Sequence, residues 1–68
     1  MENLEFETDM ITLKDLLKAT QLVHSGGLAK LIIKEEGVLL NDEPCFVPGK
    51  KLYKEDRVIF DDIIITII

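Results

Sequence analysis

Two stretches decide the fold: HSGGLAKLIIKEEGVLLND at residues 24–42 and PGKKLYKEDRVIF at residues 48–60. In the first, Ser25 precedes two glycines and an apolar segment, and Gly37 separates that segment from three residues typical of a strand. Serine is a favoured helix N-cap, and glycine readily adopts the left-handed backbone that ends a helix. The pattern therefore predicts a helix between Ser25 and Gly37, followed by short strands.

Tight turns are predicted at several points after that helix. The Asn-Asp pair at residues 41–42 suits a two-residue hairpin turn, although glycine would be better in its second place. A Pro-Gly pair at 48–49 precedes two lysines, and residues 54–56 are another polar turn. An aspartate pair at 61–62 predicts a further turn or a bulge. The strands expected between the turns are residues 38–40, 43–47 and 57–60.

The sequence before residue 24 predicts one strand followed by one helix. Residues 4–10 alternate between acidic side chains and mostly apolar ones, which is typical of a strand with one face in water. Thr12 is the expected N-cap of the helix, and Asp15 would form a capping-box-like pair with it. The face of this helix expected to lie inward carries Leu13, Leu16, Leu17, Thr20 and Val23. The expected buried arc of the second helix is Leu28, Ala29, Leu31, Ile32 and Ile33.

The C-terminal residues 63–68 are all isoleucine except for one threonine. Such a segment has high strand propensity and promotes aggregation if its edge stays open, so it needs a cover. The N-terminal strand is the expected intramolecular partner, and a homodimer or protein partner bound through this C-terminal strand is the alternative. The element order predicts one α+β domain, residues 1–68, with two short helices packed on a small, mostly antiparallel sheet.

Size and composition narrow the function. A chain of 68 residues has no room for a deep cleft between two lobes, so we expect no enzyme. No apolar run approaches the roughly 20 residues that span a bilayer, and the acidic N-terminus is unlike a signal peptide. The single cysteine, Cys45, cannot form an internal disulfide. Together these features favour a cytoplasmic protein without a membrane partner.

Charge is unevenly distributed along the chain, whose net charge is −5. Residues 1–10 carry four acids and no base, and residues 55–68 carry four acids and one arginine. Residues 11–54 instead carry seven lysines against five acids. The acidic total speaks against nucleic acid at first sight, but the mildly basic middle allows a local cationic face.

No catalytic or metal-binding pattern is visible. His24 and Cys45 belong to no metal-ligand spacing, His24 is expected to cap or to pack and Cys45 to pack, and Ser25 has no base to activate it. We therefore expect no catalytic residue, no metal and no cofactor. Tyr53 is the only tyrosine, tryptophan is absent, and the phenylalanines are expected to be structural. This argues against a platform that stacks on single-stranded bases.

The lysines are the remaining candidates for a function. They occur in three pairs: Lys14 with Lys18, Lys30 with Lys34, and Lys50 with Lys51. If folding gathers them on one rim, they suit phosphate groups as flexible point charges; otherwise they are ordinary surface lysines. The glycines at 26–27 also leave two interpretations open. They either let a ligand approach the N–H groups of the helix start, or they fit a tight corner between the helices.

The order of these features resembles the S-four RNA-binding module (the alpha-L motif), first seen in a protein of the small ribosomal subunit. The resemblance covers residues 11–60, and the pair of glycines after the capping serine is similar to the small stand-alone bacterial subgroup of YaaA-like and YbcJ-like proteins. The matching positions are Leu13-Lys14, Leu16-Leu17, Ser25-Gly26-Gly27, Ala29-Lys30, Ile33, Gly37-Val38, Leu40-Asn41, Gly49-Lys50-Lys51-Leu52 and Asp56-Arg57-Val58.

The resemblance implies binding to structured RNA, ribosomal or transfer RNA, without catalysis. The residues it assigns to RNA contact are Lys14, Lys18, Ser25, Gly26, Gly27, Lys30, Lys34, Lys50 and Lys51. The chain departs from the pattern at Leu31, Asp42, Glu55 and residues 47–48, which leaves a thinner basic surface than a typical member has. A protein-interaction module that kept the fold and lost RNA is the alternative.

Overall fold

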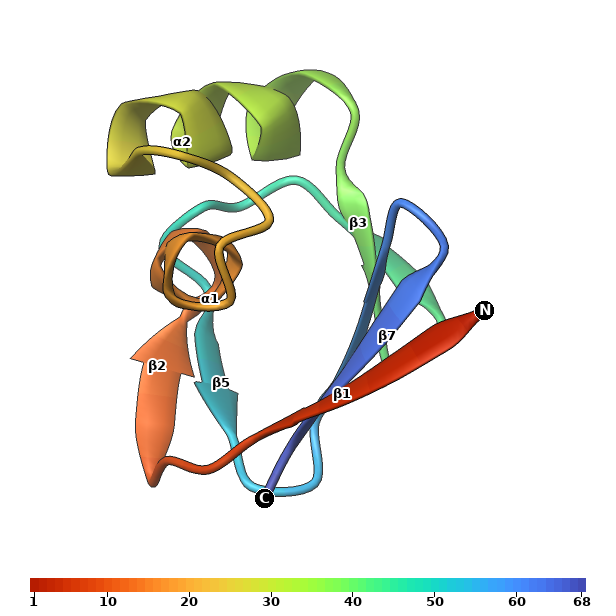
Figure 1. Ribbon diagram of the computed structural model, residues 1–68. Helices are drawn as coiled ribbons and strands as arrows, with labels where there is room; N and C mark the ends of the chain where they lie inside the picture. Colours follow the sequence, from red (N-terminus) through yellow and green to blue (C-terminus); the bar gives the residue numbers. More distant parts are fainter.

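The computed structural model describes all 68 residues, and Figure 1 shows two helices on one side of the molecule and a twisted sheet on the other. No helix has the length and apolar content that crossing a membrane requires. The elements, in chain order, are β1 (Glu2–Phe6), β2 (Met10–Thr12), α1 (Leu13–Ala19), α2 (Gly26–Glu35), β3 (Val38–Leu40), β4 (Glu43–Cys45), β5 (Lys51–Tyr53), β6 (Arg57–Phe60) and β7 (Ile63–Ile67).

The strands form two sheets. The larger has the order β1-β7-β6-β3-β4, and the smaller pairs β2 with β5. All pairings are antiparallel except that of β1 with β7, which is parallel with Leu4 opposite Ile65. The predicted α+β class, with two helices on a mostly antiparallel sheet, is therefore confirmed.

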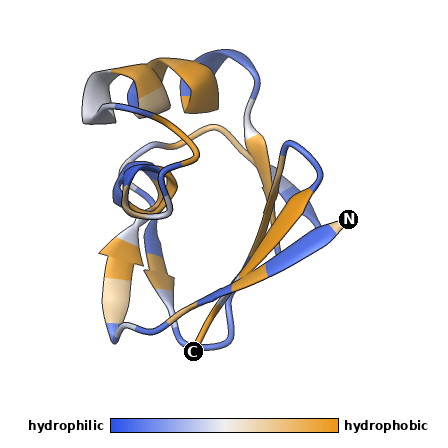
Figure 2. Ribbon diagram, in the orientation of Figure 1, coloured by the Kyte–Doolittle hydropathy of each residue, from blue (hydrophilic) through white to orange (hydrophobic).

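The C-terminal strand lies inside the larger sheet. β7 pairs with β1 on one side and with β6 on the other. The expected intramolecular cover by the N-terminal strand is thus present, and neither edge of β7 is open to a second chain. Figure 2 shows β7 as hydrophobic along its length beside the more hydrophilic β1. The acidic side chains of β1 suit an edge strand, because charge there discourages pairing with another molecule.

The N-terminal strand is shorter than predicted. β1 ends at Phe6, and residues 7–9 lead to a second short strand that pairs in the other sheet. The alternation over residues 4–10 therefore spans two strands and the bend between them. A period of two cannot distinguish one strand from two strands that meet at a bend.

One apolar cluster fills the space between the helices and the sheets. Its fully buried side chains come from α1, α2 and strands of both sheets: Leu13, Leu16, Leu17, Ala29, Ile33, Leu52, Val58, Ile65 and Ile67. The predicted inward face of α1 is confirmed for Leu13, Leu16 and Leu17, but the helix ends at Ala19, so half-buried Thr20 and buried Val23 lie beyond it. The predicted arc of α2 is only partly right, because Leu28 and Leu31 are 42% and 55% exposed.

The start of α1 differs from the prediction in a way that positions the later site. Thr12 has the extended backbone of an N-cap, but its side chain makes no cap hydrogen bond, so the expected pair with Asp15 is wrong. Carbonyl groups of the 48–50 loop take that role. The Leu13 N–H donates to the Lys50 carbonyl at 2.9 Å, and the Lys14 N–H donates to the Pro48 carbonyl at 3.0 Å. The loop is therefore attached to the first turn of the helix.

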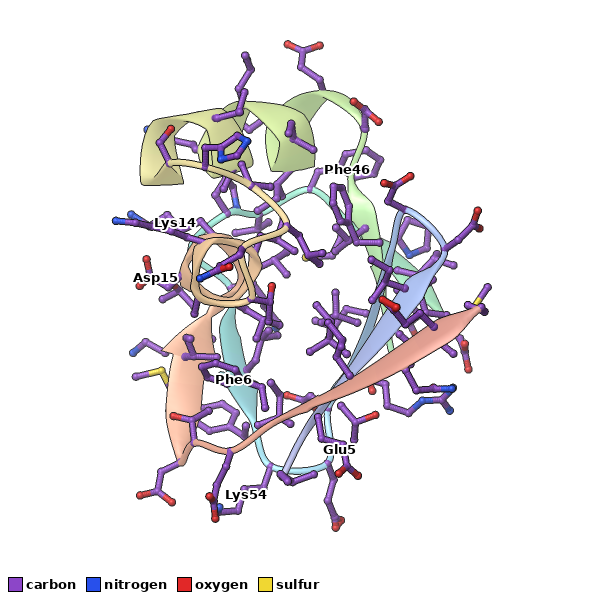
Figure 3. The ribbon with its side chains drawn as sticks, viewed as in Figure 1. Glu5, Phe6, Lys14, Asp15, Phe46 and Lys54 are labelled. Carbon is purple, nitrogen blue, oxygen red and sulfur yellow. The ribbon has the colours of Figure 1, made fainter.

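The second helix begins and ends as the sequence predicts. The Ser25 Oγ accepts from the Leu28 N–H at 3.1 Å, and Gly37 follows the helix with φ of +75°. The Phe46 ring lies against Gly37, and Figure 3 shows this ring beside the turn from α2 into β3. A Cβ at Gly37 would lie 2.7 Å from Phe46 Cε2, so glycine is required there both for its backbone and for this close approach.

Asn41 and Asp56 join two turns that lie fifteen residues apart in sequence. Residues 41–42 form the expected turn with φ of 51° and 71°, so aspartate is accommodated in its second place. The Asn41 Nδ2 donates to Asp56 Oδ1 at 3.0 Å, and its Oδ1 accepts from the Arg57 N–H at 2.9 Å. The other Asp56 oxygen accepts from the Tyr53 N–H at 2.7 Å. These bonds fix the end of β5 relative to the β3–β4 turn.

The Gly37→Ala substitution is expected to destabilise the protein by at least about 1–2 kcal/mol, because a left-handed backbone disfavours a Cβ. The Phe46 ring must also move. Urea unfolding measures the loss. The control is Gly49→Ala, where a Cβ meets nothing within 4 Å and φ is not positive. Equal stability of the two variants would contradict the close approach at Gly37.

The Asp56→Ala substitution is expected to lower the free energy of unfolding by about 1 kcal/mol, because two donors lose their acceptor near the protein surface. Asp56→Asn keeps an acceptor oxygen and should lose less. Glu43→Ala is the matched control, since this exposed acid of the neighbouring strand makes no side-chain hydrogen bond or ion pair. An unchanged unfolding curve for Asp56→Ala would show that the link between the turns contributes nothing.

Candidate nucleic-acid interface

Three of the candidate lysines lie around the start of α1, and we call them the central lysine group: Lys14, Lys50 and Lys51. The hydrogen bonds from the helix to the loop bring Lys14 and Lys50 together at the backbone. Lys51 pairs with Thr12, the residue just before the helix. Figure 3 shows the Lys14 side chain pointing outward from α1, away from the core. Cations more than thirty residues apart in sequence therefore share one corner of the molecule.

Lys18 extends this group toward the connection between the helices. It lies four residues after Lys14, so the two side chains are neighbours on the helix surface. Lys18 also lines a small hollow of about 290 Å³ with Gln21, Val23 and His24, just before the start of α2. The sequence suggests a capping or a packing role for His24; it is exposed there, so it does not pack.

The start of α2 presents free N–H groups. The N–H groups of Gly26 and Gly27 have no acceptor within the protein, as is usual for the first turn of a helix. A Cβ built at either glycine meets nothing within 4 Å. The tight-corner interpretation is therefore wrong, because no neighbouring helix crowds these glycines. The interpretation that remains is an open surface that something outside the chain can approach closely.

The two lysines of α2 are less closely connected to the central lysine group. Lys30 lies one turn after Gly26, at about 6 Å along the helix axis, and is exposed. Lys34 is in the last turn, about 12 Å along the axis from Gly26. No hydrogen bond or ion pair joins either side chain to α1 or to the loop. Lys30 can extend a surface at the helix start, and Lys34 lies toward the opposite end.

None of these six lysines is neutralised by an acid. The ion pair of the structure joins Lys54 to Asp9 at 3.6 Å, outside the candidate set. Figure 3 shows Glu5 of β1 and Lys14 of α1 on opposite sides of the molecule. The cations near α1 therefore keep their charge available to a ligand, even though the protein as a whole is acidic.

Sequence reasoning missed two aromatic side chains near the lysines. Phe46 and Tyr53 are 51% and 53% exposed. Phe46 has the structural role that was expected, against Gly37, but half of it is also open to solvent. Both rings line one open hollow together with Lys50 and Lys51. A signal for Tyr53 was present: in Lys51-Leu52-Tyr53 the buried leucine of a strand directs both neighbours to the opposite face.

Side chains that could hold a metal ion do not cluster. No group of three or more histidine, cysteine, aspartate or glutamate side chains comes together in the structure. Cys45 is free and half-buried on β4, in keeping with its expected place in a sheet. The chemistry of this surface is therefore that of lysine ammonium groups, helix N–H groups and two aromatic rings.

Comparison with known proteins gives two matches. A family model described as "S4 domain" matches residues 4–68. The chain is also 46% identical over 55 residues to a Bacillus subtilis protein, "Probable ribosome maturation protein RlbA". That alignment covers 81% of this chain and 78% of the relative. No solved structure gave a match. The matched residues include both helices and all but the first residues of β1, so the chain belongs to the S4 domain family.

Proposed function

We propose that this protein is a non-enzymatic module that binds structured RNA through the central lysine group, with Lys18 and the start of α2 extending the contact. Ribosomal RNA is the first candidate ligand and transfer RNA the second. The relative's name, a ribosome maturation protein, supports a place of action on the ribosome or its precursors, in the cytoplasm. The observation that carries the proposal is the joining of Lys14 to the Lys50 loop, without a carboxylate to neutralise either lysine.

The chemistry of this surface suits the RNA backbone. Lysine acts as a flexible point charge toward phosphates and reads no base sequence by itself. The Gly26 and Gly27 N–H groups can donate to a phosphate oxygen, and the absence of a Cβ lets that oxygen come close. Such contacts respond to the spacing and shape of phosphates. They therefore suit a folded RNA helix or loop better than a particular sequence.

Each candidate residue has a place in this proposal. Lys14, Lys50 and Lys51 would contact one stretch of backbone, and Lys18 would contact the next phosphate along α1. Ser25 fixes the first turn of α2 through its cap bond to the Leu28 N–H. Lys30 would reach the same ligand from α2, and Lys34 would contribute least because of its distance from the helix start.

A protein-interaction module without RNA is less well supported. The isoleucine-rich strand that suggested it is paired on both sides, so its edge is not available to a partner. The acidic net charge remains compatible with either function, because charge alone does not select the partner. Failure to bind RNA in the experiment below would restore this alternative.

The proposed function predicts saturable binding of fluorescently labelled ribosomal or transfer RNA in anisotropy titrations, with an affinity that falls steeply as salt rises. Displaced counterions drive such binding, and each lost phosphate contact should reduce the log–log salt slope by roughly 0.7–0.9. Lys50→Ala and Lys14→Ala are each expected to produce that reduction, whatever the RNA sequence.

Lys54→Ala is the matched control, since this lysine pairs with Asp9 and lies outside the candidate set. It should leave the salt slope unchanged. The absence of saturable RNA binding by the unaltered protein at low salt would overturn the proposal. Equal effects of Lys50→Ala and Lys54→Ala would show that binding depends on total charge and not on the central lysine group.

The Gly27→Ala substitution is expected to affect stability and RNA binding in opposite directions. Alanine is the better helix former by about 1 kcal/mol, and the site has room for its Cβ, so unfolding should require more urea. The methyl group would stand where a phosphate approaches the helix start, so RNA affinity should fall. A variant that is more stable and binds RNA as tightly as the unaltered protein would exclude contact at Gly27.

A further inference from the structure

An open hollow of about 710 Å³ lies between the β3–β4 hairpin and β5. Phe46, which follows β4, and Tyr53 of β5 both line it. Lys50 and Lys51 line it as well, so the hollow adjoins the central lysine group. Its volume is within the range of about 300–1,000 Å³ typical of small-ligand sites.

The backbone that carries the Tyr53 ring is fixed at this hollow. Tyr53 and Lys51 flank the buried Leu52 in β5, so their side chains lie on the same face, roughly 7 Å apart along the strand. The backbone of Tyr53 is fixed by Asp56, which accepts from its N–H at 2.7 Å and donates to its carbonyl at 3.1 Å. An aromatic side chain on a fixed backbone presents its ring with little loss of conformational entropy on binding.

Phe46 both packs within the fold and lines the hollow. Its edge lies against Gly37, yet 51% of the residue is open to solvent. Phe46 lines this hollow together with Tyr53, and it also lines a second hollow beside Gly37.

Two lysines and two acids line the hollow: Lys50, Lys51, Glu43 and Asp56. Both oxygens of Asp56 are engaged in hydrogen bonds, and no ion pair joins an acid to either lysine. A partly aromatic hollow with unpaired lysines suits a ligand with a flat uncharged part and an attached anion. Nucleobases stack on aromatic side chains, and their phosphates bind lysine.

We propose that this hollow receives an unpaired nucleotide of the bound RNA, whose base contacts the rings of both Tyr53 and Phe46 while its phosphate contacts Lys50 or Lys51. The inference rests on the proposed function and adds to it a preference among RNAs. A base inside a duplex is stacked on its neighbours and cannot enter. RNAs with an unpaired loop or bulge are therefore bound more tightly than the same stem fully paired.

The test compares an RNA hairpin carrying a single-stranded loop with the fully paired duplex of its stem, using anisotropy titrations. Tyr53→Leu and Phe46→Leu keep apolar bulk but remove the aromatic ring. Each is expected to weaken hairpin binding about 5-fold or more, the scale of one lost base-stacking contact, and to leave duplex binding within about 2-fold. Tyr53→Phe retains the ring and should bind as the unaltered protein does.

Leu31→Ala serves as the control for surface apolar changes, since Leu31 is 55% exposed on α2 and does not line the hollow. Urea unfolding of each variant checks that the fold persists. If Phe46→Leu fails to fold because of its contact with Gly37, the Tyr53 variants decide the question. Equal losses on hairpin and duplex, or no loss on either, would overturn the inference.

A direct readout is available in the unaltered protein. Tyr53 is the only tyrosine and the chain has no tryptophan, so tyrosine fluorescence reports this ring alone. A short single-stranded oligoribonucleotide should quench the emission saturably, and unchanged emission at saturating oligonucleotide would overturn the inference. If Lys50→Ala weakens RNA binding while Tyr53→Leu does not, the RNA function stands and the hollow is excluded. Absence of all RNA binding excludes both.

Discussion

The attachment of the 48–50 loop to the first turn of α1 is the constraint on which the rest of the structure depends. A helix start leaves N–H groups without acceptors, and here loop carbonyls supply two of them. The Thr12 hydroxyl, the residue expected to act as cap, is left buried without a partner. The position of the start of α1 therefore depends on the position of the 48–50 loop. Because the helix carries Lys14 and the loop carries Lys50, these hydrogen bonds bring the two lysines to the same corner.

β5, the strand that follows the 48–50 loop, is fixed at its far end by hydrogen bonds to Asp56. β5 begins at Lys51, next to the attached carbonyl, and ends at Tyr53, whose backbone is bound by Asp56. Asp56 is itself bound by Asn41 from the β3–β4 turn. The basic loop and its strand are thus ordered at both ends before any ligand arrives. Because the loop is already ordered in the free protein, binding loses little further conformational entropy there. A small number of contacts can then give a useful affinity.

A structural feature of this protein can be predicted from the sequence when it depends only on residues close to it in the chain. Ser25, Gly37 and the turn at residues 41–42 act on their immediate neighbours, and all three were predictable from residue type alone. The capping of α1 by the loop was not, because the acceptors come from more than thirty residues away and are backbone groups. Backbone carbonyls carry no side-chain signature that a sequence could reveal.

The same distinction explains the errors about the surface. Leu28 and Leu31 have the spacing of a buried arc, but α2 packs through Ala29 and Ile33 and turns the leucines outward. Phe46 follows a strand and has an ordinary core residue type, yet half of it is exposed. Helical periodicity gives an apolar face only to within one side chain on either flank. Packing against the neighbouring element determines which residues are covered.

Acids lie both near the proposed RNA surface and far from it. Asp15 follows Lys14 in α1, and Glu43 and Asp56 line the hollow with Lys50 and Lys51, but none of them forms an ion pair with these lysines. β1 carries Glu2 and Glu5 on the edge of the larger sheet, where charge prevents pairing with another chain. Figure 3 places Glu5 across the molecule from Lys14. At physiological salt, exposed charges are screened beyond about 8 Å, so distant acids scarcely weaken a lysine in contact with a phosphate.

The same acids act on weak, unspecific binding, which depends on net charge more than on contact geometry. A protein of net charge −5 lacks the long-range attraction that draws basic proteins to any nucleic acid. Binding would then require that several short-range contacts form together, with the lysines, the helix start and the aromatic hollow all in reach. An acidic protein with a small cationic corner is in this way more selective for a particular RNA shape than a basic protein with the same contacts.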